Sequence, residues 1–194
     1  RSTFGSIRMT LPPNPFWEYS VTLFQDESVA IACLALQERH LARVDVDVNI
    51  LLLCVWAAAN GHGELDDQDF LRAIAAVTPW RRDVLLPLRG ASRQLLGDGV
   101  EPVPEELTGD LRQEITHAEL EAERIEQLLL VQLINPAPPS LESDQSKAEN
   151  AATNFARYFA RIGLAPSTED AADLAAILER AFPEEAAGAA PVDA

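Results

Sequence analysis

Apolar residues recur three and four positions apart along most of the chain, which is the period of an amphipathic α-helix. The first helix is expected after Asn14 and Pro15, because Asn is a good N-cap and Pro fits the first helical turn. Later helices are expected where a capping residue precedes a periodic segment, at Asp26, Asp47 or Asn49, Asp66 or Asp67, and Ser167 or Thr168.

One segment is apolar on every side. All residues of 50–59 are apolar, so this helix is expected at the centre of the fold, with neighbours all around it. The Val and Asp residues over 44–48 alternate as in a strand, but an isolated strand is unstable. We therefore expect an extended connection that leads into a central helix over about 50–60.

A further helix is expected to begin at Thr78 and Pro79. It would run from Trp80 toward Leu96. Pro87 falls inside this segment, and a proline removes a backbone donor and clashes with the preceding turn. A kink or a break is therefore expected near Pro87.

The most regular pattern lies in the second half of the chain. Residues 105–134 are expected to form one long helix. Its apolar positions alternate four and three residues apart, which is typical of the seam of an antiparallel bundle or a coiled-coil hairpin. This seam consists of Leu111, Ile115, Ala118, Ala122, Ile125 and Leu129.

Changes in composition predict how the chain is divided. Residues 14–134 are expected to form a helical core domain, and the proline-rich segment 135–146 a linker. Residues 147–182 predict a pair of helices that either docks on the core or binds something else. Residues 183–194, rich in Ala, Glu and Gly, are expected to be a disordered tail.

The predicted fold class is all-α. We expect an irregular bundle of about eight helices around the central apolar helix, followed by the linker and the C-terminal helical hairpin. A chain of 194 residues is long enough to bury a core. Residues 1–9 are interpreted as a remnant of expression, with the natural start at Met9.

Charge and cysteine content narrow the function classes. The formal net charge is −16, with 9 Lys and Arg against 11 acids up to residue 95, and 6 against 20 from residue 96. Nucleic acid is an improbable partner for such a chain, because phosphate neutralisation needs clustered cations. No apolar run reaches the roughly 20 residues of a membrane span, and no secretory signal pattern is present. Buried, reduced Cys33 and Cys54 favour the cytoplasm.

Metal-binding patterns are incomplete. Glu114 and His117 form half of a di-iron motif, but the second half has Gln37 three residues before His40, where a Glu is needed. Both Glu114 and His117 lie off the apolar seam and are expected to face water. A calcium-loop pattern over 45–50 fails because its sixth position is not Gly. No metal, cofactor or catalytic residue is therefore predicted, and no nucleophile elbow, phosphate loop or dinucleotide fingerprint occurs.

One local patch departs from the acidic character of the chain. Between Leu71 and Leu95 only Asp83 opposes a set of arginines, namely Arg72, Arg81, Arg82, Arg89 and Arg93. On a regular helix Arg82, Arg89 and Arg93 would share one face. The predicted ligand- or partner-binding residues are Trp80, Arg81, Arg82, Arg89 and Arg93. The alternative is that these arginines pair with the acids of the protein itself.

Several short motifs in order resemble a family of small proteobacterial proteins catalogued as a domain of unknown function. The resemblance spans about residues 14–134 and implies no activity, ligand or catalytic residue. The motifs that carry it are Asn14-Pro-Phe-Trp17, Ala32-Cys-Leu-Ala-Leu-Gln-Glu38, Asp47-Val-Asn-Ile-Leu-Leu-Leu53, Pro79-Trp80, Pro87-Leu-Arg89 and Glu119-Leu-Glu-Ala-Glu-Arg-Ile-Glu126.

Two hypotheses for function remain. The first is a non-enzymatic protein-interaction or adaptor protein, whose partner is another protein or a second copy joined through the seam over 111–129. The second is a small-molecule-binding protein or enzyme that holds an anionic ligand with the arginine patch. A di-metal site at Glu114 and His117 is a third and weaker hypothesis.

Overall fold

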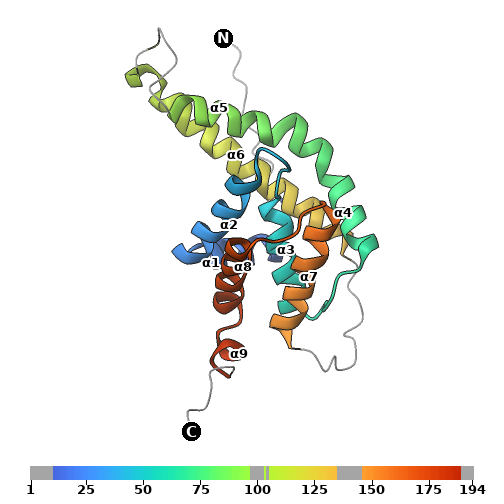
Figure 1. Cartoon of the computed structure of the whole chain (residues 1–194). Helices are drawn as coiled ribbons and strands as arrows, with labels where there is room; N and C mark the ends of the chain where they lie inside the picture. Colours follow the sequence, from blue (N-terminus) through green and yellow to red (C-terminus); the bar gives the residue numbers. More distant parts are fainter. Residues whose placement is uncertain (1–10, 97–102, 104, 135–145, 189–194) are drawn as a thin grey trace.

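A computed structural model describes residues 11–96, 103, 105–134 and 146–188. All regular elements in these ranges are helical, which confirms the predicted all-α class (Figure 1). The interpretation of residues 1–9, most of the expected linker and the end of the expected tail lie outside the described residues.

The helices follow one another with short connections. In chain order they are α1 (Pro15–Phe24), α2 (Glu27–His40), α3 (Val48–Ala59), α4 (Asp67–Trp80), the π-helix η1 (Arg81–Leu85), α5 (Leu86–Leu96), α6 (Glu105–Leu133), α7 (Lys147–Arg161), α8 (Thr168–Ala181) and α9 (Pro183–Gly188). Because α4, η1 and α5 are continuous, they can be counted as one helix, and the described residues then contain eight helices.

Side-chain caps fix where the helices begin. The Asn14 Oδ1 atom accepts hydrogen bonds from the backbone N–H groups of Phe16 and Trp17, at 3.1 and 3.3 Å. The other predicted caps resolve to Asp26 for α2, Asp47 for α3, Asp66 for α4 and Ser167 for α8. These caps satisfy backbone donors that a helix start would otherwise leave free.

The apolar helix α3 lies at the centre, as predicted. Every side chain from Val48 to Ala58 is buried, and α1, α2, α6, α7 and α8 all pack against α3. Two alternatives were open for the C-terminal helices, and the structure has them docked, α7 on α3 and α8 on α2 (Figure 1). Phe155, Tyr158 and Ile177 belong to the same apolar core as Phe16.

The expectation of a disordered tail from residue 183 is wrong for its first residues. Residues 183–188 form α9, since Pro183 fits the first turn and Glu184 complements the positive helix N-terminus. Glu185 also accepts a hydrogen bond from the backbone N–H of Ala148, at 2.8 Å, which ties this turn to α7.

The expectation that Thr78 and Pro79 begin a helix is also wrong. Helix α4 runs through Pro79 and continues without a break into η1 and α5. The Leu86 N–H bonds to the carbonyl of Arg81, five residues earlier. This wide π turn lies directly before Pro87, whose ring would crowd the carbonyl four residues earlier in a regular α-helix. The predicted disruption at Pro87 therefore takes the form of one inserted residue.

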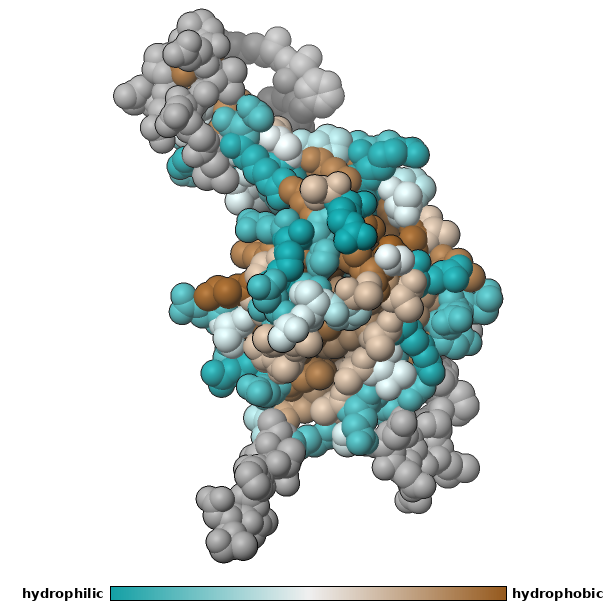
Figure 2. Space-filling model, viewed as in Figure 1, coloured by the Kyte–Doolittle hydropathy of each residue, from teal (hydrophilic) through white to brown (hydrophobic). Residues whose placement is uncertain are grey.

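The surface differs between regions of the molecule. The α5–α6 pair crosses one end of the body and extends beyond it (Figure 1). This pair carries many polar residues, although Leu107 and Leu111 of α6 are exposed. A mildly apolar surface covers α7 and α8, where Ala152, Ala156, Ala171 and Ala175 are exposed (Figure 2). Among the described residues, no helix is both long and apolar enough to cross a membrane.

Candidate functional site

The arginine patch does not form one continuous surface. The inserted residue in η1 rotates everything after it by about 100° relative to a regular helix. As a result Arg82 is 69% exposed and pairs with its neighbour Asp83, whereas Arg89 is only 11% exposed. Arg93 follows Arg89 by four residues within α5, so these two share a side of that helix, whereas the inserted residue takes Arg82 off it. The expected common face of all three arginines is therefore wrong.

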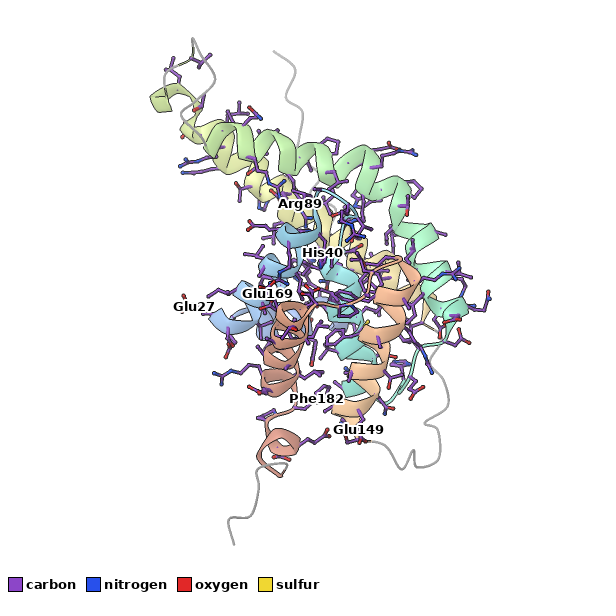
Figure 3. All side chains as sticks on the ribbon, viewed as in Figure 1. Glu27, His40, Arg89, Glu149, Glu169 and Phe182 are labelled. Atoms are coloured by element: carbon purple, nitrogen blue, oxygen red, sulfur yellow. The ribbon has the colours of Figure 1, made fainter. Side chains whose placement is uncertain are left out.

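Arg89 and Trp80 attach their helices to α6. Arg89 Nη2 lies 2.6 Å from Glu123 Oε1, and Arg89 Nε lies 3.2 Å from Glu119 Oε1 (Figure 3). Trp80 is half-buried, and its indole N–H donates to the carbonyl of Ala122 at 3.0 Å. These groups already have partners inside the chain, so their role in binding a ligand or partner stays a prediction.

Arg81 is buried among three carboxylates. Its guanidinium lies 2.5 Å from Asp45 Oδ2, 2.9 Å from Asp47 Oδ1 and 3.1 Å from Glu126 Oε1. The π turn directs this side chain inward and brings together acids from the connection before α3 and from α6. The guanidinium occupies the place a bound cation would take. Within the described ranges, no group of three or more His, Cys, Asp or Glu is arranged to hold a metal ion.

One of these carboxyls holds its proton unusually strongly. Burial, followed by the charge of Asp47, raises the pKa of Glu126 to about 8. Asp47 Oδ2 and Glu126 Oε2 are both buried, and neither has a hydrogen-bond donor among the described residues. A proton on Glu126 that is shared with Asp47 satisfies both oxygens. We call Arg81 with Asp45, Asp47 and Glu126 the Arg81 centre. It combines a protonated carboxyl with ion pairs and joins the start of α3 to α6 and η1.

A second polar cluster joins α2 to α8. His40 Nε2 lies 3.0 Å from the fully buried Asp170, which also accepts from Arg39 and from the backbone N–H of Ser167. Figure 3 shows His40 beside the α8 segment that contains Glu169. Burial alone would raise the pKa of Asp170, but these hydrogen bonds outweigh it and lower the pKa to about 2. This cluster therefore attaches α8, and with it the C-terminal pair of helices, to α2.

The Arg81 centre continues into a polar chain that ends at a pocket. Asn49 Nδ2 donates to Glu126 Oε1 at 3.0 Å, and Gln127 Nε2 donates to Asn49 Oδ1 at 2.8 Å. Asn49 and Gln127 both line a pocket of about 170 Å³ between α1, α2, α3 and α6. A second hollow of about 360 Å³ lies on the other side of the centre, lined by Asp45, Arg81 and apolar residues.

The 170 Å³ pocket has apolar walls and a polar floor. Its walls include Trp17, Val21, Phe24, Leu34, Leu52 and Leu120. Its polar lining includes Ser20, Gln37 and Gln127, with Arg89 and its partner Glu123 at one side. A concave apolar site with a few placed polar groups is suited to holding an apolar group in a fixed orientation.

The rim of this pocket is unusually apolar for an exposed surface. Val21, Leu34 and Leu120 line the pocket and are also solvent-exposed. On α2, Ile31 and Leu34 are 59 and 50% exposed, and Leu41, which directly follows the helix, is 46% exposed. We call these five residues, Val21, Ile31, Leu34, Leu41 and Leu120, the α2 face. The sequence does carry a signal for this outward side of α2, since residues 27, 31, 34, 38 and 41 are spaced four and three apart.

Other candidate residues have no such setting. Glu114 and His117 are exposed on α6, as expected for residues off the seam. Burial raises the pKa of the Cys33 thiol to about 12, and that of Cys54 also rises, so both thiols stay protonated and inert.

The fold and the pocket define an all-α helical protein with a small apolar binding pocket beside a buried charged centre. The chain belongs to the family described as "Protein of unknown function (DUF2390)", whose profile matches residues 15–130. Arg81, its carboxylate partners and the lining of the 170 Å³ pocket all lie within this match. Of the residues that line the second hollow, Tyr158 and Ile162 lie outside it. Comparisons with curated proteins and with solved structures gave no match.

Proposed function

We propose that this protein is a non-enzymatic interaction or adaptor protein, and that the α2 face binds a basic amphipathic helix of another protein. The observation that carries the proposal is the second apolar stripe on α2, which lies opposite the core. Ile31, Leu34 and Leu41 recur three and seven residues apart on this outward side. Exposed apolar residues that recur along one side of a helix are typical of interaction sites.

The spacing of the α2 face suits a helix as the partner. The stripe follows the four-and-three rhythm of a helix–helix seam, with Glu27 before Ile31 and Glu38 between Leu34 and Leu41. A partner helix that presents apolar residues at the same rhythm would bury the stripe. The pocket beside Leu34 would then receive one side chain of that partner as an anchor.

Charge supports a basic partner. Glu27 and Glu38 are exposed on the stripe itself, and the chain carries a formal net charge of −16. A field of one sign accelerates the approach of an oppositely charged partner and opposes that of a second copy. Homodimerisation through the seam over 111–129 has less support, because Ala122 in the middle of that seam is buried and bound by Trp80.

The geometry lends less support to the ligand-binding alternative. An anionic ligand would need free arginines, but Arg81 and Arg89 bind carboxylates of the chain itself. The anion would also have to approach a strongly acidic protein. Arg82 and Arg93 are exposed, and their binding to a partner is compatible with an adaptor protein.

The test is site-specific photocrosslinking in a lysate of cells that express the protein. A photoreactive phenylalanine derivative replaces Ile31 on the α2 face, which does not line the pocket, and in a matched control it replaces Leu71, which is exposed on α4. We expect crosslinks from position 31 to one partner segment with basic residues and helical apolar spacing, and none from position 71. Mass spectrometry identifies the segment.

A synthetic peptide of that segment then gives the affinity. We expect Ile31→Glu to weaken peptide binding by at least about tenfold, since it places a charge in the seam, whereas Leu71→Glu leaves it unchanged. Affinity should fall as salt rises, because exposed charges are screened. Crosslinks that map to a second copy of the chain, or to an acidic segment, would contradict the proposal.

A further inference from the structure

Two residues that line the pocket beside Leu34 each have a buried polar atom without a partner among the described residues. Ser20 is 3% exposed and Gln127 is 2% exposed. Neither Ser20 Oγ nor Gln127 Oε1 has a hydrogen-bond partner among the described residues. Buried polar atoms in native proteins are nearly always paired, so water or a bound group has to supply these bonds.

The polarity of the Gln127 amide is fixed by the charged centre. Glu126 Oε1 accepts from Arg81, and the same oxygen accepts from Asn49 Nδ2. The Oδ1 atom of Asn49 is therefore the atom available to accept from Gln127 Nε2. Gln127 Oε1 is then left as an acceptor that needs a donor. An amide in isolation could be flipped, but this chain of bonds sets its orientation.

We propose that the pocket receives the phenol side chain of a tyrosine in the partner helix. This inference rests on the proposed function and names the anchor residue of the same surface. A phenol hydroxyl donates one hydrogen bond and accepts another, so it can donate to Gln127 Oε1 and accept from the Ser20 hydroxyl. Its ring suits a pocket of about 170 Å³ with Trp17 and Phe24 in the wall, since a cavity of about 150 Å³ accommodates benzene.

Other anchors match the pocket less well. A leucine or phenylalanine would fill the apolar part but leave both polar atoms unpaired. A carboxylate would place negative charge beside the Gln127 acceptor and Glu123. A lysine or arginine would find Glu123 already paired with Arg89 at 2.6 Å. The phenol is the side chain that combines an apolar ring with a donor and an acceptor at one end.

The first experiment titrates the full chain with side-chain analogues and follows amide shifts by NMR. The probes are p-cresol, 4-methylanisole, which keeps the ring and oxygen but loses the donor, and toluene, which has no oxygen. We expect p-cresol to bind about tenfold more tightly than 4-methylanisole, with shifts at residues that line the pocket. Equal or tighter binding of 4-methylanisole or toluene would overturn the inference.

Variants link the preference to the two polar atoms. Gln127→Met removes the acceptor and should reduce the preference for p-cresol over toluene to near unity. Ser20→Ala, which changes one atom, should lower it in part. Leu34→Trp changes an exposed rim residue and should weaken all three probes alike. If Gln127→Met unfolds the chain, Ser20→Ala still decides the question, because an unchanged preference in that variant contradicts the assignment.

A last step separates the inference from the proposed function. In the peptide identified by crosslinking, Tyr→Phe should weaken binding about tenfold. If the peptide binds but Tyr→Phe has no effect, the anchor is wrong while the adaptor function stands. If p-cresol shows the expected preference but no partner segment crosslinks at position 31, the adaptor function fails. Tighter binding of free p-cresol than of the peptide would overturn the assignment to a partner side chain.

Discussion

At the scale of single residues, the hydroxyl of Tyr158 connects the C-terminal helices to the buried charged centre. It accepts a hydrogen bond from the backbone N–H of Asp47 at 2.8 Å, and both residues are buried. Asp47 in turn caps α3 and pairs with Arg81. One hydroxyl on α7 thus supports the residue that positions both the central helix and the guanidinium.

We expect Tyr158→Phe to lower the free energy of unfolding by about 1–3 kcal/mol, because the buried N–H of Asp47 loses its acceptor. Tyr19→Phe is the matched control, since the Tyr19 hydroxyl is buried without a partner among the described residues and its loss should change stability little. Urea unfolding followed by circular dichroism measures both variants. Equal effects in the two variants would contradict this role of Tyr158.

Glu126 gives the protein a pH dependence between about pH 4.5 and 8. Its pKa is raised from the ordinary value of 4.5 to about 8, so between these pH values the folded state holds a proton that the unfolded state releases. The free energy of unfolding should therefore fall as pH rises through this window, by up to about 1.4 kcal/mol per pH unit. Above about pH 8 this contribution levels off.

Glu126→Gln tests this assignment, because a neutral amide can replace the protonated acid beside Asp47. We expect the variant to be at least as stable as the wild type at pH 8 and to lose most of the slope between pH 5 and 8. Urea midpoints across this range provide the measurement. An unchanged slope in the variant would show that the slope arises elsewhere in the chain.

The sequence predicted the capping residues but not these buried pairs. A cap depends on the few residues that follow it, so Asn14 and Asp26 could be recognised locally. The pairing of Arg81 with Asp47 and Glu126 joins positions far apart in the chain, and no local pattern encodes it. Likewise, only the packing of the helices reveals that Gln127 Oε1 is buried without a hydrogen-bond partner among the described residues.

At the scale of elements, Asp170 holds α8 against α2. It caps its own helix through Ser167 and binds both Arg39 and His40. Its pKa of about 2 lies below the ordinary value of 3.8, so the folded state favours the ionised carboxylate. The corresponding stability is present above about pH 4 and is lost as pH falls toward 2.

Asp170→Asn should therefore lower the free energy of unfolding by about 3–5 kcal/mol at pH 7, as expected when one partner of a buried ion pair is removed. The difference from the wild type should shrink as pH falls below 4. Asp173→Asn, which also removes a partner of Arg39 but at a partly exposed site, should cost less than about 1 kcal/mol. A loss for Asp170→Asn that does not change with pH would contradict the ionised assignment.

Helix boundaries show where element-scale prediction succeeds and fails. The disruption at Pro87 follows from proline chemistry, but its form as a π turn depends on Arg81 and Trp80 finding partners on α6 and before α3. The same turn invalidates the expected alignment of Arg82 with Arg89. One inserted residue thus divides the predicted arginine surface. Arg89 lies in a largely buried ion pair, whereas Arg82 and Arg93 are exposed.

At the scale of the whole molecule, one core unites segments that the sequence divides. The proline-rich segment 135–146 and the family match over 15–130 both suggest a domain that ends before α7. Yet the buried side chains of α7 and α8 pack against α2 and α3 in a single core. The signal was present in the apolar face of α7, because two helices cannot bury such a face by themselves.

A chain that ends at Ile134 should therefore lose its cooperative fold. It would expose the surface of α3 that packs on Phe155, Tyr158 and Phe159 and lose the Asp170 clamp. Each large apolar side chain contributes roughly 1.5–3 kcal/mol when buried, so three of them already rival a typical total stability of about 5–15 kcal/mol. Thermal and urea unfolding of the truncated and full chains measure the difference.

The full chain should unfold in one transition, with the same midpoint by far-ultraviolet circular dichroism and by tryptophan fluorescence. The tryptophans lie in α1, α3 and α4, whereas α7 and α8 contribute helix signal alone, so a hairpin that melts separately would split the two midpoints. Adding residues 146–188 as a separate polypeptide should restore structure to the truncated chain. If instead the truncated chain melts cooperatively at the midpoint of the full chain, the C-terminal helices are an appended unit, and the α2 face belongs to an independent domain.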